Sequence, residues 1–290
     1  MSAMTDSSRR WALRYTAHLG YEPPLLRPQF QATLGNDVSA HVHNAAMLGM
    51  SGVLYPWVLG RPPTEVRAVR DALRATGLVS SCVVTVPLES FMEPIWTDRT
   101  SSGRQRIERT ISKAAAAASE LDTGVLMVPL AEDPAEANRD VQLEAAAHNL
   151  RIAANVAADN GMVIGIEPMK LLPGLLVRSI SEAVAVIEAT DHKSAGIIFD
   201  TGHASDTDGD VESAFAMAFP YMVLLQIVDQ PGRVEPTTDS LPLIRIAAEA
   251  LRRGYRGLVD LEHGWRDLSI AGERNGVDAI KSFDAAVQES

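Results

Sequence analysis

Residues 162–168 read Met-Val-Ile-Gly-Ile-Glu-Pro, and residues 195–203 read Ala-Gly-Ile-Ile-Phe-Asp-Thr-Gly-His. Each stretch is a short apolar run that ends in a carboxylic acid, Glu167 in the first and Asp200 in the second. Runs of this kind are typical of parallel β-strands that are buried on both faces. A helical pattern lies between them, so the two stretches predict a strand–helix–strand unit with an acidic side chain at the end of each strand.

The same alternation continues on both sides of this unit. Helical patterns cover residues 64–76, 107–121, 134–158, 241–253 and the C-terminus, and a capping box at Ser179–Glu182 begins another helix. The eight predicted strands are Ser51–Tyr55, Leu78–Val86, Gly124–Val128, Met162–Ile166, Ala195–Phe199, Met222–Val228, Gly257–Leu261 and a weaker candidate near Leu25–Leu34.

Eight strand–helix units in a chain of 290 residues predict an α/β fold, a (β/α)8 TIM barrel in a single domain. A doubly wound sheet is the main alternative, but no glycine-rich dinucleotide fingerprint or P-loop follows any predicted strand. We expect residues 1–20 to form an N-terminal tail with a short surface helix at Arg9–His18. The barrel is then expected to span residues 21–290.

The composition excludes several classes of partner. The 26 Lys and Arg residues are outnumbered by 37 Asp and Glu residues, which gives a net charge of −11. An acidic chain without a basic block is a poor ligand for nucleic acid or for an anionic membrane surface. The lone cysteine, Cys82, precludes an intrachain disulfide, and no apolar run approaches the roughly 18 residues of a membrane span. We expect a cytoplasmic protein without a nucleic-acid or membrane partner.

Polar side chains end four successive predicted strands, namely Glu167, Asp200, Gln226 and Glu262. A single acid at a strand end is more often a helix cap or a surface charge. Four such residues, each one strand–helix unit from the next, would instead converge at the C-terminal end of a barrel, where TIM-barrel chemistry occurs. Three carboxylates packed together repel one another unless a cation neutralises them. Oxygen ligands favour Mn²⁺ or Mg²⁺, with Co²⁺ or Zn²⁺ as alternatives.

These residues lie in motifs that resemble the xylose isomerase-like TIM barrels of the sugar isomerase/epimerase group, and hydroxypyruvate isomerase-like proteins in particular. The motifs are Ile166-Glu167-Pro168, Phe199-Asp200-Thr-Gly-His203, the segment from Gln226 to Pro236, and the segment from Gly254 to Glu262. The resemblance is strong from about Gly161 to Glu262.

The resemblance implies a divalent metal held by Glu167, Asp200, Gln226 and Glu262. It also implies that Glu167 and Glu262 are the catalytic acid/base pair, acting on a keto sugar or related hydroxy-carbonyl compound through a metal-bound enediolate. His203 and Arg233 are expected to contact substrate oxygens. We also place Glu235 among the substrate-binding residues, where with Asp229 it would order the loop that carries Arg233.

Two departures from the family pattern bear on the substrate. Lys170 stands where relatives usually have Asn; it would either pair with a carboxylate or phosphate of the substrate or lie solvated in its loop. No carboxylate follows the second strand, where Tyr55 and Trp57 would form an apolar or stacking wall. The resemblance implies a small sugar-like substrate and is compatible with a homo-oligomer.

Other functions remain as alternatives. The same enolate chemistry would serve a lyase, such as an inosose or dehydroshikimate dehydratase or an enzyme of glycoside β-elimination. A DNA-repair endonuclease on this barrel would need a His-rich three-zinc cluster and a basic face, which seven scattered His residues and a charge of −11 disfavour. A metal-free scaffold would require the four strand-end residues to coincide by chance.

Overall fold

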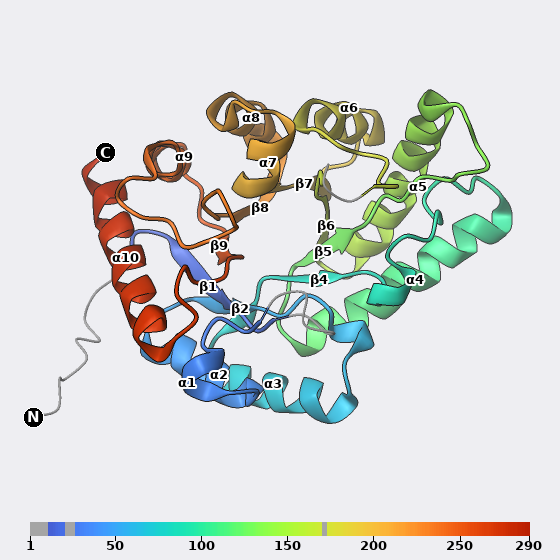
Figure 1. The fold of residues 1–290 in the computed structure, drawn as a ribbon. Helices are drawn as coiled ribbons and strands as arrows, with labels where there is room; N and C mark the ends of the chain where they lie inside the picture. Colours follow the sequence, from blue (N-terminus) through green and yellow to red (C-terminus); the bar gives the residue numbers. More distant parts are fainter. Residues whose placement is uncertain (1–10, 21–26, 170–172) are drawn as a thin grey trace, which may run out of the picture.

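Parallel strands arranged in a ring form the centre of the computed structural model, which describes residues 11–20, 27–169 and 173–290 (Figure 1). Neighbouring strands pair in the order β3-β2-β1-β9-β8-β7-β6-β5-β4, and every pairing is parallel. The strands are β1 (Arg14–His18), β2 (Gly52–Leu54), β3 (Val79–Ser80), β4 (Cys82–Val84), β5 (Val125–Val128), β6 (Val163–Ile166), β7 (Ala195–Asp200), β8 (Met222–Gln226) and β9 (Leu258–Leu261).

The predicted strand Leu78–Val86 is divided into β3 and β4 at Ser81. β3 pairs with β2, whereas β4 pairs with β5. The Ser81 N–H still donates to the Val53 oxygen at 2.9 Å, so the divided strand joins the two ends of the sheet. The prediction of a single-domain TIM barrel is confirmed.

Helices surround the ring of strands (Figure 1). They are α1 (Gln31–Leu34), α2 (Val38–Met47), α3 (Pro63–Thr76), α4 (Ser101–Glu120), α5 (Arg139–Asp159), α6 (Ile180–Thr190), α7 (Thr201–Thr207), α8 (Val211–Ala218), α9 (Leu241–Arg252) and α10 (Ile270–Glu289), with short 3₁₀ turns η1 (Val58–Gly60), η2 (Leu88–Ser90) and η3 (Phe219–Tyr221). The predicted cap of α6 is present, because the Ser179 hydroxyl accepts the Glu182 N–H at 3.3 Å. No helix within these described ranges has both the length and the apolarity of a membrane span.

The N-terminal part of the prediction was wrong. Arg14–His18, expected in a surface helix, is strand β1, and it pairs with β2 and with β9. The barrel therefore includes part of the segment assigned to the tail. Residues 27–34 of the weak strand candidate form no strand, and Gln31–Leu34 is α1; Leu25 and Leu26 lie outside the described residues. β1 lacks a run of branched aliphatic residues, because Thr16 and His18 alternate with Tyr15 and Ala17.

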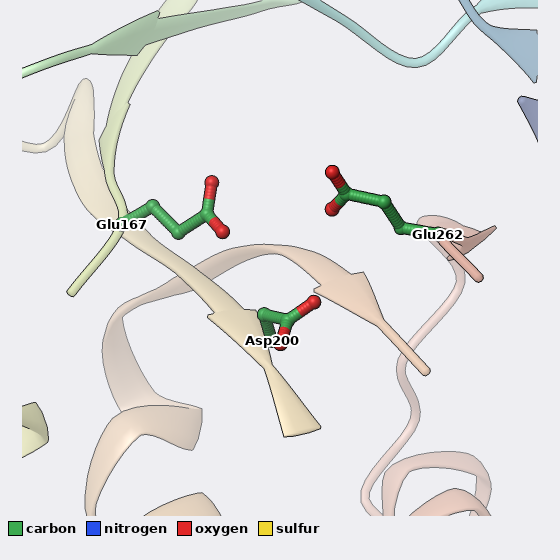
Figure 2. A group of neighbouring side chains, drawn as sticks. All are labelled: Glu167, Asp200 and Glu262. Atoms are coloured by element: carbon green, nitrogen blue, oxygen red, sulfur yellow. The ribbon is translucent and has the colours of Figure 1, made fainter. Parts of the chain in front are cut away.

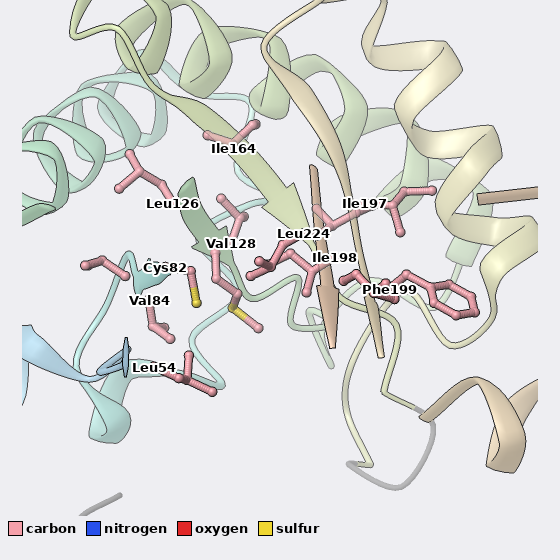
Figure 3. Close-up of a cluster of buried hydrophobic side chains, with 14 of the residues drawn as sticks. Leu54, Cys82, Val84, Leu126, Val128, Ile164, Ile197, Ile198, Phe199 and Leu224 are labelled. Atoms are coloured by element: carbon pink, nitrogen blue, oxygen red, sulfur yellow. The ribbon is translucent and has the colours of Figure 1, made fainter. Parts of the chain in front are cut away.

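Aliphatic side chains from the strands pack against the helices to form the core (Figure 3). Leu126, Ile164, Ile197 and Phe199 are fully buried there. Many of the buried residues of α4 and α5 are alanines. A barrel packed with small aliphatic residues gives rigid strands, and a rigid strand holds the side chain at its end in a fixed place.

Four adjacent strands of the barrel carry polar residues that are in register with one another. Asp200 on β7 is in register with Gln226 on β8, Gln226 with Asp260 on β9, and Asp260 with Thr16 on β1. All four residues are buried. We call them the polar row. Residues in register on parallel strands are direct neighbours across the sheet, so the row is a continuous line of buried polar side chains from β7 to β1 that begins at the strand-end acid Asp200.

Candidate metal centre

Three of the predicted strand-end residues meet at the C-terminal end of the barrel. Glu167 follows β6 directly, Asp200 ends β7 and Glu262 follows β9. One carboxylate oxygen of each lies within 4.8 Å of the other two. Figure 2 shows Glu167 and Glu262 pointing their carboxylates toward each other, with Asp200 between them. We call these three residues the acidic cluster.

Burial and mutual repulsion dominate the electrostatics of the acidic cluster. Burial raises the pKa of Glu167 well above its usual range, and the negative charges of Glu262 and Asp200 raise it further. Burial is the largest single influence on the pKa of Asp200 and acts upward, but the contacts with Arg233 and His203 together outweigh it, and the net pKa is lowered. The cluster is thus a place where positive charge is bound strongly.

Arg233 supplies positive charge to the cluster from the loop after β8. Its guanidinium donates to the two oxygens of Asp200 at 3.0 and 2.8 Å, and it lies 3.5 Å from Glu262 Oε2. The Arg233 backbone has φ +51°, a left-handed conformation that is uncommon for residues other than glycine. Gly202 leaves space for it, since a Cβ there would lie 3.0 Å from Arg233 Nη1.

Gln226 provides the fourth predicted oxygen. Its Nε2 donates to Asp260 Oδ2 at 3.4 Å, whereas its Oε1 is buried and has no hydrogen-bond partner within the described ranges. A buried amide oxygen without a partner is costly unless something binds it. Three carboxylates and a carboxamide oxygen form the kind of donor set that Mg²⁺ or Mn²⁺ prefers, so the residues present fit a divalent cation.

His203 lies beside the acidic cluster on α7. The Asp200 side chain caps this helix by accepting the His203 N–H at 2.6 Å. The imidazole Nε2 is 3.5 Å from Glu167 Oε1. Burial lowers the pKa of His203, so the ring is neutral near pH 7. A neutral ring at this position is able to donate to, or accept from, a polar ligand next to Glu167.

Other predicted residues lie elsewhere. Glu235 accepts the Arg266 N–H at 2.9 Å, so its contact ties the loop after β8 to the loop after β9. Tyr55 is fully buried and its hydroxyl donates to Glu65 at 2.8 Å, so the expected wall at this residue is wrong. Trp57 packs against Phe91, with ring centroids 5.4 Å apart. Lys170 lies outside the described residues.

The prediction missed a second group of buried polar side chains near the C-terminal ends of β1 and β9. His18 Nε2 lies 2.7 Å from the His263 oxygen, and Gln29 Nε2 donates to the Leu261 oxygen at 2.9 Å. Burial lowers the pKa of His18 to about 4 and that of His263 to about 3, so both rings are neutral. The alternation of Thr16 and His18 with apolar residues was the available signal for an inward-facing strand.

A parallel barrel with oxygen ligands at its C-terminal mouth defines the class, a TIM barrel with a candidate metal centre. The model of the xylose isomerase-like TIM barrel family matches residues 42–285. The chain belongs to this family, which confirms the resemblance found in the sequence motifs.

Curated relatives include isomerases. A Streptomyces coelicolor protein provisionally named hydroxypyruvate isomerase is 33% identical over 137 residues, 45% of this chain and 47% of that protein. That match spans about half the length of the relative. The 2-oxo-tetronate isomerase of Haemophilus influenzae is 24% identical over 231 residues, 79% of this chain and 88% of that protein.

The crystal structure of 3-keto-D-glucoside 4-epimerase from E. coli superposes with a TM-score of 0.71. The alignment covers 94% of this chain and 99% of the epimerase, with 17% sequence identity. At this identity the similarity shows a shared fold.

Proposed function

We propose that the protein is a divalent-metal-dependent isomerase or epimerase of a keto sugar or a related hydroxy-carbonyl compound. The observation that carries the proposal is the acidic cluster, whose three carboxylates come within 4.8 Å of one another at the mouth of the barrel. The isomerase names of two curated relatives support the same class of reaction.

Glu167, Asp200, Gln226 and Glu262 would hold the cation, with Mn²⁺ or Mg²⁺ as the preferred ions. When bound, the ion supplies Lewis-acid polarisation of the carbonyl and of the neighbouring hydroxyl oxygen of the substrate. The buried Oε1 of Gln226, which has no hydrogen-bond partner within the described ranges, supports its place in this set.

Glu167 and Glu262 carry the proton transfers in this proposal. One carboxylate oxygen accepts the proton from the carbon next to the carbonyl, and the C–H electron pair moves toward the carbonyl oxygen to give an enediolate. The other Glu, or the same one, then returns a proton. Protonation of the former carbonyl carbon gives the isomer, once the proton of the neighbouring hydroxyl has passed to the former carbonyl oxygen so that the neighbouring carbon becomes the new carbonyl. Protonation of the original carbon from the opposite face gives the epimer. The facing carboxylates in Figure 2 support this division of labour.

Substrate oxygens are bound by His203 and Arg233. His203 Nε2 is near Glu167, and Arg233 reaches both Asp200 and Glu262, so the two side chains flank the reacting position. Lys170 is proposed to pair with a carboxylate or phosphate on the substrate. Glu235 contributes by fastening the loop that carries Arg233.

The experiment that tests this function follows hydrogen exchange in D₂O. The protein is incubated with Mn²⁺ and with keto sugars, keto-inositols or hydroxypyruvate, and proton NMR is used to detect loss of the signal next to the carbonyl. We expect metal-dependent exchange with at least one compound, and its loss in Glu262→Gln.

Glu273→Gln is the matched control, because it makes the same change at a buried carboxylate on the outer helix α10. It should retain the exchange. Exchange that persists in Glu262→Gln, or that needs no metal, would contradict the proposal. New olefinic signals would instead identify a lyase.

A further inference from the structure

Gln226 is the one proposed ligand whose side chain has two chemically opposite ends. Its Oε1 can bind a cation, whereas its Nε2 carries only donors and would repel one. The two ends have almost the same shape, so packing alone does not select between them. Something must therefore hold the amide with its oxygen toward the acidic cluster.

Asp260 lies where it can hold the Gln226 amide in this orientation. It is in register with Gln226 on the neighbouring strand β9, and its Oδ2 accepts from Gln226 Nε2 at 3.4 Å. Asp200 is in register with Gln226 on the other neighbouring strand, β7, so Gln226 lies between Asp260 and a member of the acidic cluster. Oε1 is the end that is buried and lacks a hydrogen-bond partner in the described part of the chain.

The orientation of Asp260 is itself fixed from the other side. Thr16, in register on β1, donates its hydroxyl to Asp260 Oδ1 at 2.5 Å, which leaves Oδ2 for Gln226. Asp260 and Thr16 are fully buried, so bulk water does not compete for their hydrogen bonds. An ionised carboxylate only accepts hydrogen bonds and therefore selects the NH₂ end of the amide.

Without the Asp260 carboxylate as acceptor, the side-chain amide of Gln226 would rotate by half a turn and exchange the positions of its oxygen and nitrogen. The NH₂ group would then point at the carboxylates of the acidic cluster, because a hydrogen bond to an ionised oxygen is stronger than one to a neutral group. That orientation places donors where the cation should bind.

We propose that Asp260 is a positioning residue that holds the Gln226 side-chain amide with its oxygen toward the metal site. The inference rests on the proposed function, since it assumes that Gln226 is a ligand. It assigns a role in metal binding to Asp260, a member of the polar row that is not itself a proposed ligand.

A double-mutant cycle tests the inference through metal affinity rather than turnover. Wild type, Asp260→Asn, Gln226→Glu and the double variant are stripped of metal with EDTA and titrated with Mn²⁺ in a calorimeter at pH 7.5. Asn at position 260 can donate to Gln226 Oε1 and so stabilise the wrong orientation. We expect Asp260→Asn to weaken Mn²⁺ binding by about ten- to a hundredfold, as for other partners of metal ligands.

The Gln226→Glu background separates orientation from charge. A carboxylate has two oxygens and no wrong end, so Asp260→Asn should change the affinity there by no more than about twofold, or should strengthen it. The same fold loss in both backgrounds would mean that only the charge of Asp260 matters and would overturn the inference. Asp284→Asn, at a buried carboxylate on α10, is the matched control and should bind Mn²⁺ like wild type.

The outcomes also distinguish failure of the proposed metal-dependent function from failure of the inference about Asp260. Failure of the wild type to bind Mn²⁺ would overturn the metal-dependent function together with the inference. Tight binding by wild type and by Asp260→Asn alike would overturn the inference alone.

If Asp260→Asn does not fold, the wild type provides the test. The Gln226 side-chain NH₂ signal, identified by its absence in Gln226→Glu, should be protected from exchange with water both before and after Mg²⁺ is added. Rapid exchange in either state would overturn the inference.

Discussion

Replacing Arg233 with Ala removes the guanidinium that donates to both oxygens of Asp200. The Asp200 side chain is fully buried, whereas that of Arg233 is 27% exposed. Breaking a buried ion pair costs 3–5 kcal/mol, and water that enters beside a partly exposed guanidinium favours the lower end, about 3 kcal/mol. An unfolding entropy of about 0.6 kcal/mol/K for a chain of this length converts that loss into a melting point about 5 °C lower.

The assay is urea unfolding of metal-free protein, repeated with Mn²⁺. Because Arg233 and a bound cation neutralise the same carboxylates, Arg233→Ala should regain much of its stability with Mn²⁺ and should bind the ion more tightly than wild type. Arg245→Ala is the control: it breaks an exposed pair with Glu212 and should leave the stability nearly unchanged. An Arg233→Ala variant that is as stable as wild type without metal, or that binds Mn²⁺ more weakly, would refute the reasoning.

Three further predictions concern catalysis, pH and packing. Glu262→Gln should lower the rate of exchange next to the carbonyl by about a thousandfold, measured by NMR in D₂O, and a loss below tenfold would exclude Glu262 as an acid/base group. Burial lowers the pKa of His18 to about 4, so the unfolded chain takes up its proton first, and stability should fall by up to about 3 kcal/mol between pH 6.5 and 4. Urea unfolding should show a flatter pH dependence for His18→Gln, and an identical slope would contradict the burial argument. Gly276→Ala, normally stabilising in a helix, should destabilise by about 1–3 kcal/mol, because the new Cβ would lie 2.1 Å from the Trp265 ring; a higher melting temperature would show that the ring moves freely.

Most of the barrel could be predicted because its strands are apolar on both faces. Ile164 and Ile197 are buried whichever way they point, so their strands appear as continuous apolar runs. Strand β1 escaped this pattern because its inward-facing residues, Thr16 and His18, are polar, and they pack against other buried polar groups rather than aliphatic ones.

The candidate site also has a part that the sequence predicts and a part that only the structure reveals. Glu167, Asp200 and Glu262 could be found from the sequence, because each ends an apolar run and the strands of a barrel end together. The contacts of Arg233 and Glu235 depend on the path of the loop after β8, which spacing along the chain does not determine. The pairing of Asp260 with Gln226 depends on the register of β8 and β9, which becomes visible once the strands are placed side by side.

The central claim is that one divalent cation binds among the carboxylates at the mouth of the barrel, and anomalous diffraction from crystals soaked in Mn²⁺ tests it most directly. We expect a single strong manganese peak surrounded by Glu167, Asp200, Glu262 and the Oε1 of Gln226. No peak at this position, with Arg233 still bound to both oxygens of Asp200, would contradict the assignment of the acidic cluster as a metal centre.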